Sequence, residues 1–395
     1  MHNMKNTHQT QETYKTYAEI NLDALEHNYR VIADAVRRGT PEVKLLCIVK
    51  ADAYGHGVEN CVPLLASLGV HSFGVSCIEE ARAVRACAPA GSDILILGYT
   101  PPENAEELAA DGYLQTVYSS EYAAMLSCAA CRAGGTVRIH LKIDTGMNRI
   151  GFPSEDPVAS AAAVRSAMRL PGLKPEGIFT HFANADATDA ASVITQHNRF
   201  LAVLDALGSD ADALCVHCCN SAAALRFPDM RHDMVRAGII LYGLSPARDF
   251  PLPVRLSPVM TFQTTVTHIH TLRAGESVSY GSCFTADRDR RIATLGVGYA
   301  DGFLRAFSAG GAVLIKGRRA PILGRVCMDQ CMVDIGDADV HVGDTAYIFD
   351  PSGQNIEALA ETAQTISYEL LCLVGKRVHR VINRREKELS NKNNG

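Results

Sequence analysis

The feature that most constrains the fold is an alternation of short apolar runs with amphipathic segments between Tyr17 and about Pro246. This rhythm is typical of repeated βα units around a parallel sheet. We expect eight strands, at AEINL (18–22), KLLCIV (44–49), HSFGVS (71–76), ILILG (94–98), LQTVY (114–118), VRIHLKID (137–144), EGIFTHF (176–182) and ALCVHC (213–218). Eight is the number of strands that closes a (β/α)8 barrel.

The pattern changes after Pro246 to a period-two alternation of apolar and polar residues, as in MTFQTTVTHIHTL (260–272). Such alternation indicates half-buried strands. We therefore expect an α/β plus β fold, an N-terminal (β/α)8 TIM-like barrel followed by a mostly β C-terminal domain. We divide the chain into a disordered tail, the barrel, the β-rich domain and a second disordered tail, at 1–14, 15–250, 251–385 and 386–395. The strand at 16–22 could pair with either domain.

Charge and cysteine usage exclude several classes of protein. The 395 residues carry 38 basic and 43 acidic side chains, and they lack a basic stripe, which disfavours nucleic acid as a partner. Thirteen cysteines, an odd number, lie in apolar segments and indicate thiols in a reducing compartment. Because we find neither a secretory signal nor an apolar stretch long enough to span a bilayer, we expect a cytoplasmic protein with no membrane partner.

The segment VKADAYGHG (49–57) carries the first candidate for chemistry. Lys50 closes an apolar strand, and Tyr54 follows four residues later in a glycine-flanked loop. Burial at the strand end favours the neutral amine, which is the nucleophilic form. The segment indicates amine chemistry on a cofactor, although a surface lysine after a core strand has the same local sequence.

Further polar residues follow the other apolar runs. Reactive groups in a (β/α)8 barrel lie at the carboxyl ends of the strands. The candidates at such ends are Lys142, Arg149, His181, Asn220, Ser221 and Arg236. Each alone also fits a structural role, such as an ion-paired arginine. In the β-rich region, Tyr280, Tyr299 and Tyr368 fit packing positions of a sheet, but neighbouring glycines favour close approach to a ligand.

Nine motifs occur in the order found in one enzyme family. They are VKADAYGHG, KIDTGMNRIG, THFANAD, NSAAAL, VRAGI, VSYG, GYADG, CMDQ and ISYE. From about Tyr17 to Val381 the chain resembles the alanine racemase family, pyridoxal 5'-phosphate (PLP) enzymes with a barrel and a β domain. The resemblance implies an isomerase that interconverts L-alanine and D-alanine and supplies D-alanine for the peptidoglycan of the cell wall.

The resemblance also implies roles for the candidate residues. Lys50 carries the cofactor covalently and is one catalytic base, and Tyr280 is the other. Because the family brings this tyrosine from the partner subunit, a homodimer with shared active sites is implied. The implied cofactor-binding set is Lys50, Tyr54, Arg149, His181, Asn220, Ser221, Arg236, Gly238, Ile239 and Tyr368.

The remaining implied roles concern the substrate and its path. The Met328 amide and Arg149 position the substrate carboxylate. Lys142 is implied to be carbamylated, because an unmodified lysine beside Arg149 would place two cations side by side. Asp329 is implied to be a supporting residue, and no metal is implied. The implied entrance residues are Asp186, Tyr299, Asp301, Arg305 and Arg325.

Three alternatives stay open. A racemase for serine or a broad set of amino acids would share these motifs, although Tyr280, Tyr299 and Tyr368 favour a small side chain. A non-catalytic PLP carrier built from a barrel alone is disfavoured by the roughly 140 residues beyond the barrel. A metal site at the CxxC of 128–131 or at 218–219 lacks a second ligand pair. The segment LLCLVGKRVHR lacks the prolines usual in the family, which leaves side-chain tolerance open.

Overall fold

The computed structural model describes residues 15–385, which divide into two compact units. The barrel unit comprises 28–256, and the β unit comprises the described residues up to 27 together with those from 257 onward. The barrel unit thus starts later and ends slightly later than the expected 15–250. The tails expected at 1–14 and 386–395 lie outside the described residues.

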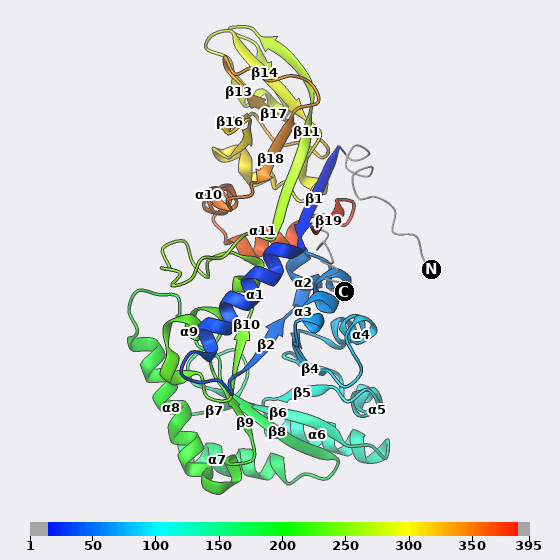
Figure 1. Cartoon of the computed structure of the whole chain (residues 1–395), viewed down its shortest axis with the longest axis vertical. Coiled ribbons are helices and arrows are strands. Elements are labelled where there is room, and N and C mark those ends of the chain that lie inside the picture. Colours follow the sequence, from blue (N-terminus) through cyan, green and yellow to red (C-terminus); the bar gives the residue numbers. More distant parts are fainter. Residues whose placement is uncertain (1–14, 386–395) are drawn as a thin grey trace, which may run out of the picture. The chain divides into compact units, whose positions relative to one another are not determined.

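The barrel unit is built on eight parallel strands within residues 28–256 (Figure 1). Their order is β10, β2, β3, β4, β5, β6, β8, β9, and hydrogen bonds from Asp233 N to Val216 O (3.1 Å) and from Arg236 N to Cys219 O (3.0 Å) join its two ends. A short strand, β7 (Phe152–Pro153), pairs with β6. The strand bounds are β2 Lys44–Ile48, β3 Ser72–Val75, β4 Asp93–Ile96, β5 Leu114–Val117, β6 Val137–Asp144, β8 Leu173–Phe179, β9 Cys215–His217 and β10 Met234–Ala237.

Helices alternate with these strands along the chain (Figure 1). Their bounds are α2 Lys50–Gly55, α3 Val58–Ser67, α4 Ile78–Cys87, α5 Ala105–Ala110, α6 Ser120–Arg132, α7 Pro157–Met168, α8 Ala191–Leu207 and α9 Ser221–Arg226. Side chains cap several of them; Asp156, for example, accepts from two amides of the first turn of α7. All four residues of β5 are buried, because helices cover a parallel sheet on its outer face and side chains fill its interior.

The β unit is a closed and mainly antiparallel sheet. Its order is β14, β17, β16, β15, β18, β11, β1, β19, and β14 also pairs with β11, so the sheet closes. A bulge between Val266 and His268 lies where β11 changes partner from β18 to β14. The bounds are β1 Thr16–Asn21, β11 Met260–Leu272, β12 Ser277–Val278, β13 Phe284–Thr285, β14 Arg290–Leu295, β15 Ala312–Ile315, β16 Arg318–Leu323, β17 Cys331–Asp334, β18 Thr345–Phe349, β19 His379–Asn383, α10 Gln354–Thr362 and α11 Ser367–Leu373.

The predicted fold class is confirmed, and the structure decides the sheet of the strand that the sequence left open. AEINL, counted among the barrel strands but able to pair with either domain, lies in β1 of the β unit, where Ala18 is opposite Phe262 of β11 and Arg380 of β19. Burial alternates along β1, as expected for a strand with one exposed face. The eighth barrel strand is instead β10, in which Arg236 interrupts the apolar residues, so no continuous apolar run marks it. Helix α1 (Leu22–Arg37) contains the boundary between the units.

Two global features concern the described residues as a whole. Between residues 15 and 385, no helix combines the length and the apolar composition needed to cross a membrane. The thirteen cysteines all lie in this range, and none forms a disulfide bond there.

Candidate active site

The loop after β2 presents Lys50 and Tyr54 on a left-handed turn. Residues 51–54 have φ between 51° and 54°, although none of them is glycine. This conformation costs roughly 1–2 kcal/mol for each L-residue, so the surroundings must hold it. The turn places Lys50 directly after the buried strand and Tyr54, which is 6% exposed, at its end.

Two carboxylates hold this turn. Asp52 Oδ1 accepts from Val58 N at 2.8 Å. Glu80 bridges two segments, since Oε1 accepts from Ala51 N and Oε2 from Ser76 N, both at 2.7 Å. Sequence analysis missed Glu80, whose only signal was its position in the first turn of α4, a helix that follows the neighbouring strand.

Tyr54, Ser221 and Gly238 form a cradle at adjacent strand ends. Gly238 N donates to Ser221 Oγ at 2.9 Å. A β-carbon at Gly238 would lie 2.9 Å from Tyr54 Oη and 3.4 Å from Ser221 Oγ, so a side chain there would crowd both hydroxyls. Ile239, which is buried, begins a short 3-10 turn directly after the cradle. Two hydroxyls beside a glycine backbone fit a phosphate group, whose oxygens accept hydrogen bonds.

Arg236 lies on β10 with 3% of its surface exposed, and acceptors surround its guanidinium. Nη1 donates to His217 Nδ1 at 2.7 Å, while Nη2 donates to Thr180 O at 2.8 Å and to Cys218 O at 2.9 Å. Nη2 also lies 3.2 Å from His181 Nδ1. Burial lowers the pKa of Arg236 to about 10, so the group stays charged at neutral pH and acts only as a donor.

Two buried histidines continue this network into the barrel. Because His217 accepts at Nδ1, its Nε2 carries the proton and donates to His140 Nδ1 at 3.0 Å. Burial lowers the pKa of His140 to about 4 and that of His217 well below its ordinary value, so both rings are neutral. No sequence pattern predicted either histidine. The signal for His140 was its position two residues before Lys142, on the same face of β6.

Five basic side chains of the barrel unit lie close enough for their charges to act on one another. They are Lys50, Lys142, Arg149, His181 and Arg236. Lys142 is 4% exposed, and burial followed by the charges of Arg149 and Arg236 lowers its pKa to about 8. Burial and the charges of Arg236, Arg149, Lys142 and Lys50 lower the pKa of His181 well below its ordinary value. The structure thus brings together the strand-end groups that the sequence singled out.

The loops after β6 and β9 position Arg149 and Asn220. Asp144 accepts from three backbone amides of its loop, including Arg149 N at 2.9 Å, and it leaves the Arg149 side chain exposed. Asn220 Oδ1 caps α9, and its Nδ2 donates to Phe182 O at 3.3 Å. Asp186, predicted at the entrance, is exposed.

In the β unit, a cavity of about 690 Å³ brings Tyr280 and Met328 together. Its lining is Ser279, Tyr280, Gly281, Cys327, Met328, Asp329 and Gln330. Tyr280 is 71% exposed and Met328 is 52% exposed. Ser279 adopts a φ of 70° and donates from Oγ to Arg325 O at 2.6 Å, which ties the Tyr280 turn to the Met328 loop.

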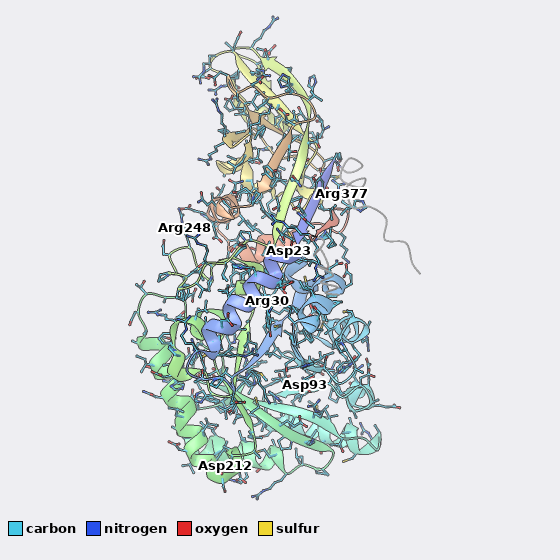
Figure 2. The ribbon with its side chains drawn as sticks, in the orientation of Figure 1. Asp23, Arg30, Asp93, Asp212, Arg248 and Arg377 are labelled. Atoms are coloured by element: carbon cyan, nitrogen blue, oxygen red, sulfur yellow. The ribbon has the colours of Figure 1, made fainter. Side chains whose placement is uncertain are left out.

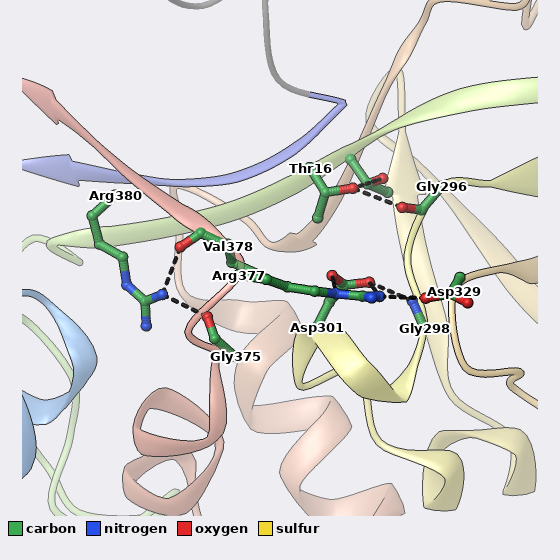
Figure 3. A network of polar contacts seen from close by, with 10 residues as sticks. Thr16, Gly296, Gly298, Asp301, Asp329, Gly375, Arg377, Val378 and Arg380 are labelled. Atoms are coloured by element: carbon green, nitrogen blue, oxygen red, sulfur yellow. Dashed lines mark hydrogen bonds and ion pairs between the residues drawn. The ribbon is translucent and has the colours of Figure 1, made fainter.

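Arg377 joins two aspartates beside this cavity (Figure 3). Nε and Nη2 donate to the two carboxylate oxygens of Asp301 at 2.6 and 3.0 Å, and Nη2 lies 2.7 Å from Asp329 Oδ1. Asp301 also accepts from Gly298 N at 2.9 Å and closes the turn that carries Tyr299. Arg377, labelled in Figure 2, therefore fixes the Tyr299 turn against the loop of Asp329. Sequence analysis missed Arg377.

The other predicted residues of the β unit lie on separate elements. Arg305 and Arg325 are exposed, and Arg325 Nη1 would lie 2.9 Å from a β-carbon at Gly281. Tyr368 is half-buried on α11. These residues belong to a different unit from Lys50.

A parallel barrel with a lysine-bearing turn beside a phosphate-sized cradle, joined in one chain to a closed β domain, is the architecture of a two-domain PLP-type isomerase. Family models agree over nearly the whole chain. The model described as "Alanine racemase, N-terminal domain" matches residues 20–246, and "Alanine racemase, C-terminal domain" matches 259–382. The chain belongs to the alanine racemase family, and the predicted family is confirmed.

Individual relatives show the same similarity. The chain is 42% identical over 368 residues to the alanine racemase of Desulfovibrio desulfuricans, covering 92% of this chain and 97% of the relative. A solved alanine racemase of Clostridium difficile superposes with a TM-score of 0.86 at 38% identity, covering 94% and 96% of the two chains. The Bacillus anthracis alanine racemase, solved with bound L-Ala-P, gives a TM-score of 0.86 at 31% identity, again over 94% and 96%.

Proposed function

We propose that this chain interconverts L-alanine and D-alanine with PLP, which is the cofactor that its family uses, and that it supplies D-alanine for peptidoglycan. The observation that carries the proposal is the pairing of Lys50 with the cradle of Tyr54, Ser221 and Gly238. An amine and an anion cradle at adjacent strand ends match the two ends of this cofactor, its aldehyde and its phosphate. The thiols without disulfide bonds fit a reducing, cytoplasmic setting.

The cradle supports the cofactor on steric grounds. The space beside Gly238 exists because no side chain fills it, and both hydroxyls border that space. Tyr368 and the amide of Ile239 complete the proposed phosphate set, and Arg149 with Asn220 borders the ring. When bound, PLP stabilises negative charge that develops at the α-carbon of an amino acid.

Racemisation then requires one acid–base group on each face of the α-carbon, to remove the proton from one side and return it from the other. Lys50 serves one face and Tyr280 serves the other, each protonated when its counterpart is not. Exposure of 71% leaves the Tyr280 ring available to a second molecule. We propose that it reaches Lys50 of a second copy of the chain, in a homodimer with two shared sites.

Arg236 supports racemisation over other PLP chemistry. A charged guanidinium donates and does not accept, so it keeps the acceptor that it faces unprotonated. We propose that it faces the ring nitrogen, which limits electron withdrawal and disfavours transamination. Neutral His217 accepts a hydrogen bond from the guanidinium, and His140 in turn accepts one from His217.

Substrate binding falls to Arg149 and the loop of Met328. Arg149 and the Met328 amide hold the substrate carboxylate, and a carbamate on Lys142 pairs with Arg149 in place of a buried cation. Asp329, held by Arg377, supports the Met328 loop. We place Asp186, Tyr299, Arg305 and Arg325 at the entrance.

The decisive experiment compares racemisation of alanine and serine by the purified chain and records the visible absorbance of the enzyme-bound cofactor. We expect bound PLP and faster turnover of alanine, because three tyrosines narrow the pocket around the side chain. If serine is turned over faster than alanine, serine is the preferred substrate and the proposed substrate is wrong. If the chain binds PLP but racemises neither amino acid, the result favours a non-catalytic PLP carrier. If the purified chain does not bind PLP, the proposal is refuted.

A further inference from the structure

We propose that His197, Cys218 and His232 form a Zn²⁺-binding site in the barrel unit, separate from the substrate site. His197 lies on α8, Cys218 directly follows β9, and His232 lies just before β10. Three separate segments between residues 197 and 232 thus deliver two imidazoles and one thiol to the same place. Two histidines and a cysteine match the ligand preference of Zn²⁺.

The histidine pair already has nearly the spacing of two metal ligands, and the Cys218 thiol must move toward it to bind the same ion. His197 Nε2 and His232 Nε2 are 3.0 Å apart, and the three potential ligand atoms all lie within 4.8 Å of one another. Two nitrogens bound to Zn²⁺ at about 2.0–2.1 Å with a tetrahedral angle lie about 3.4 Å apart. The rings need to separate by only a few tenths of an ångström, while the sulfur must leave the Met230 carbonyl, to which it donates at 3.0 Å.

The protonation states fit this assignment. Burial lowers the pKa of both histidines; the His232 ring lowers that of His197 further, and Asp233 partly opposes the shift at His232. Both rings are therefore neutral at pH 7, and each has a lone pair for a metal. The hydrogen bond with Cys219, together with burial, raises the pKa of the Cys218 thiol. Zn²⁺ would therefore release one proton to solvent as the sulfur–metal bond forms.

His232 is held in an unfavourable backbone conformation that aims its ring at His197. Its φ is 47°, which is uncommon for a residue other than glycine. Both neighbours are anchored, since Arg231 donates to Val36 O at 2.8 Å and Asp233 accepts from Val216 N at 2.7 Å. Strain that the surroundings enforce often marks a functional position. His232 also lines an open cleft, which gives ions in solution a route to the ring.

The site lies close to the substrate machinery without belonging to it. Cys218 O accepts from Arg236, and His217 is the adjacent residue, but the thiol of Cys218 makes its hydrogen bond to Met230 O and not to the guanidinium. The competing account is a neutral histidine pair joined by a single hydrogen bond. That account predicts no metal affinity.

The test is titration of the purified full-length chain with Co²⁺, followed by displacement with Zn²⁺. We expect about one Co²⁺ per chain, with thiolate-to-metal charge transfer and the intense visible bands of a four-coordinate ion bound by the three side chains and one water. His197→Gln, His232→Gln and Cys218→Ser should each weaken binding by at least roughly 100-fold, because each removes a direct ligand. Both histidines are half-exposed, so their variants should fold, and a metal-free thermal transition checks this.

Two variants serve as matched controls. His268→Gln breaks another close histidine pair, His268 and His270 on β11, whose ring centroids are 5.0 Å apart. Cys219→Ser removes the neighbouring thiol. Both should retain the cobalt bands. The proposal is overturned if the wild type shows no thiolate charge transfer, if Cys218→Ser keeps it, or if His268→Gln abolishes binding.

Discussion

Arg236 donates from Nη1 to Nδ1 of His217 across 2.7 Å, and this contact determines the tautomer of two buried histidines. His217 must carry its proton on Nε2, where it donates to His140. The charged guanidinium of Arg236 thus donates to His217, which donates to His140, and both histidine rings are neutral. The guanidinium has no nearby carboxylate in this chain of contacts, so its charge is directed at whatever acceptor it faces.

Arg236→Glu should reverse this electrostatic arrangement. A carboxylate accepts where the guanidinium donates, so a proton is expected on the ring nitrogen, together with stronger electron withdrawal. We expect racemisation to fall at least roughly tenfold and more pyruvate to form from alanine per racemisation event. Arg138→Gln, which removes an arginine paired with Asp93 and Glu176, is the control. An unchanged ratio of pyruvate to racemised product in Arg236→Glu would count against the electronic role.

Lys50→Ala should abolish racemisation and the visible absorbance that a covalently held cofactor gives. No other lysine lies on the turn beside the Tyr54 cradle. The control is Lys44→Ala, at the exposed start of the same strand, which should keep both signals. Retained covalent-cofactor absorbance in Lys50→Ala would refute the assignment.

Tyr280→Phe should slow racemisation roughly 10²–10⁴-fold, the range for loss of a general acid or base. The loss should be unequal for exchange of the α-proton of L- and D-alanine, because each base serves one face. Tyr347→Phe, a tyrosine of β18, controls for loss of a hydroxyl in the same unit. Equal and small losses for both enantiomers would remove Tyr280 as a base.

Mixing the two inactive variants should restore activity if the sites are shared. A mixed dimer of Lys50→Ala and Tyr280→Phe chains has one site with both wild-type residues and one with neither. Random reassembly from equal amounts should recover about a quarter of the wild-type activity, because about half of the dimers are mixed. Each variant reassembled alone is the control. If mixing yields no more activity than these controls, both bases come from the same chain.

The sequence was sufficient for the fold class and for most of the barrel site, because buried parallel strands appear as apolar runs and their carboxyl ends converge. It counted the strand of β1 toward the barrel while leaving its sheet open, and it missed β10. The alternating burial of β1 belongs to an antiparallel sheet, and Arg236 interrupts the apolar residues of β10. Glu80, His217 and Arg377 were missed for a different reason: each acts by holding a partner distant in sequence, which no local pattern encodes.

Lys142 should bind CO₂. With a pKa of about 8, roughly one amine in ten is neutral at pH 7. The neutral amine adds to CO₂, an N–C bond forms, a proton leaves, and a carbamate replaces a buried cation. Supplying ¹³C-bicarbonate should give a carbamate ¹³C resonance that is absent in Lys142→Met and retained in the exposed-lysine control Lys174→Met. The same spectrum from wild type and Lys142→Met would exclude the modification.

The modification also predicts a pH dependence. The folded pKa of unmodified Lys142 lies below its ordinary value of 10.5, so its charged form opposes folding. Stability is therefore favoured above pH 10.5, and about 3 kcal/mol is lost as pH falls from 10.5 to the folded pKa of about 8. CO₂-depleted protein should lose Tm between pH 10 and pH 7 more steeply than protein kept in bicarbonate. Parallel curves would contradict this linkage.

Arg377→Ala should lower both stability and substrate affinity. Asp301 is 5% exposed, and loss of its bidentate partner leaves a buried carboxylate poorly compensated, at a cost of roughly 1–3 kcal/mol. Because Arg377 also holds Asp329 beside Met328, we expect KM for alanine to rise more than kcat falls. Lysine cannot form the two-pronged contact with Asp301. The Tm and KM of Arg377→Lys should therefore lie between those of the wild type and those of Arg377→Ala. The control is Arg318→Ala, whose exposed pair with Asp337 at 3.5 Å should contribute little. Equal Tm and KM for the Arg377→Ala and Arg318→Ala variants would show that the Asp301–Arg377–Asp329 network does not position the loop.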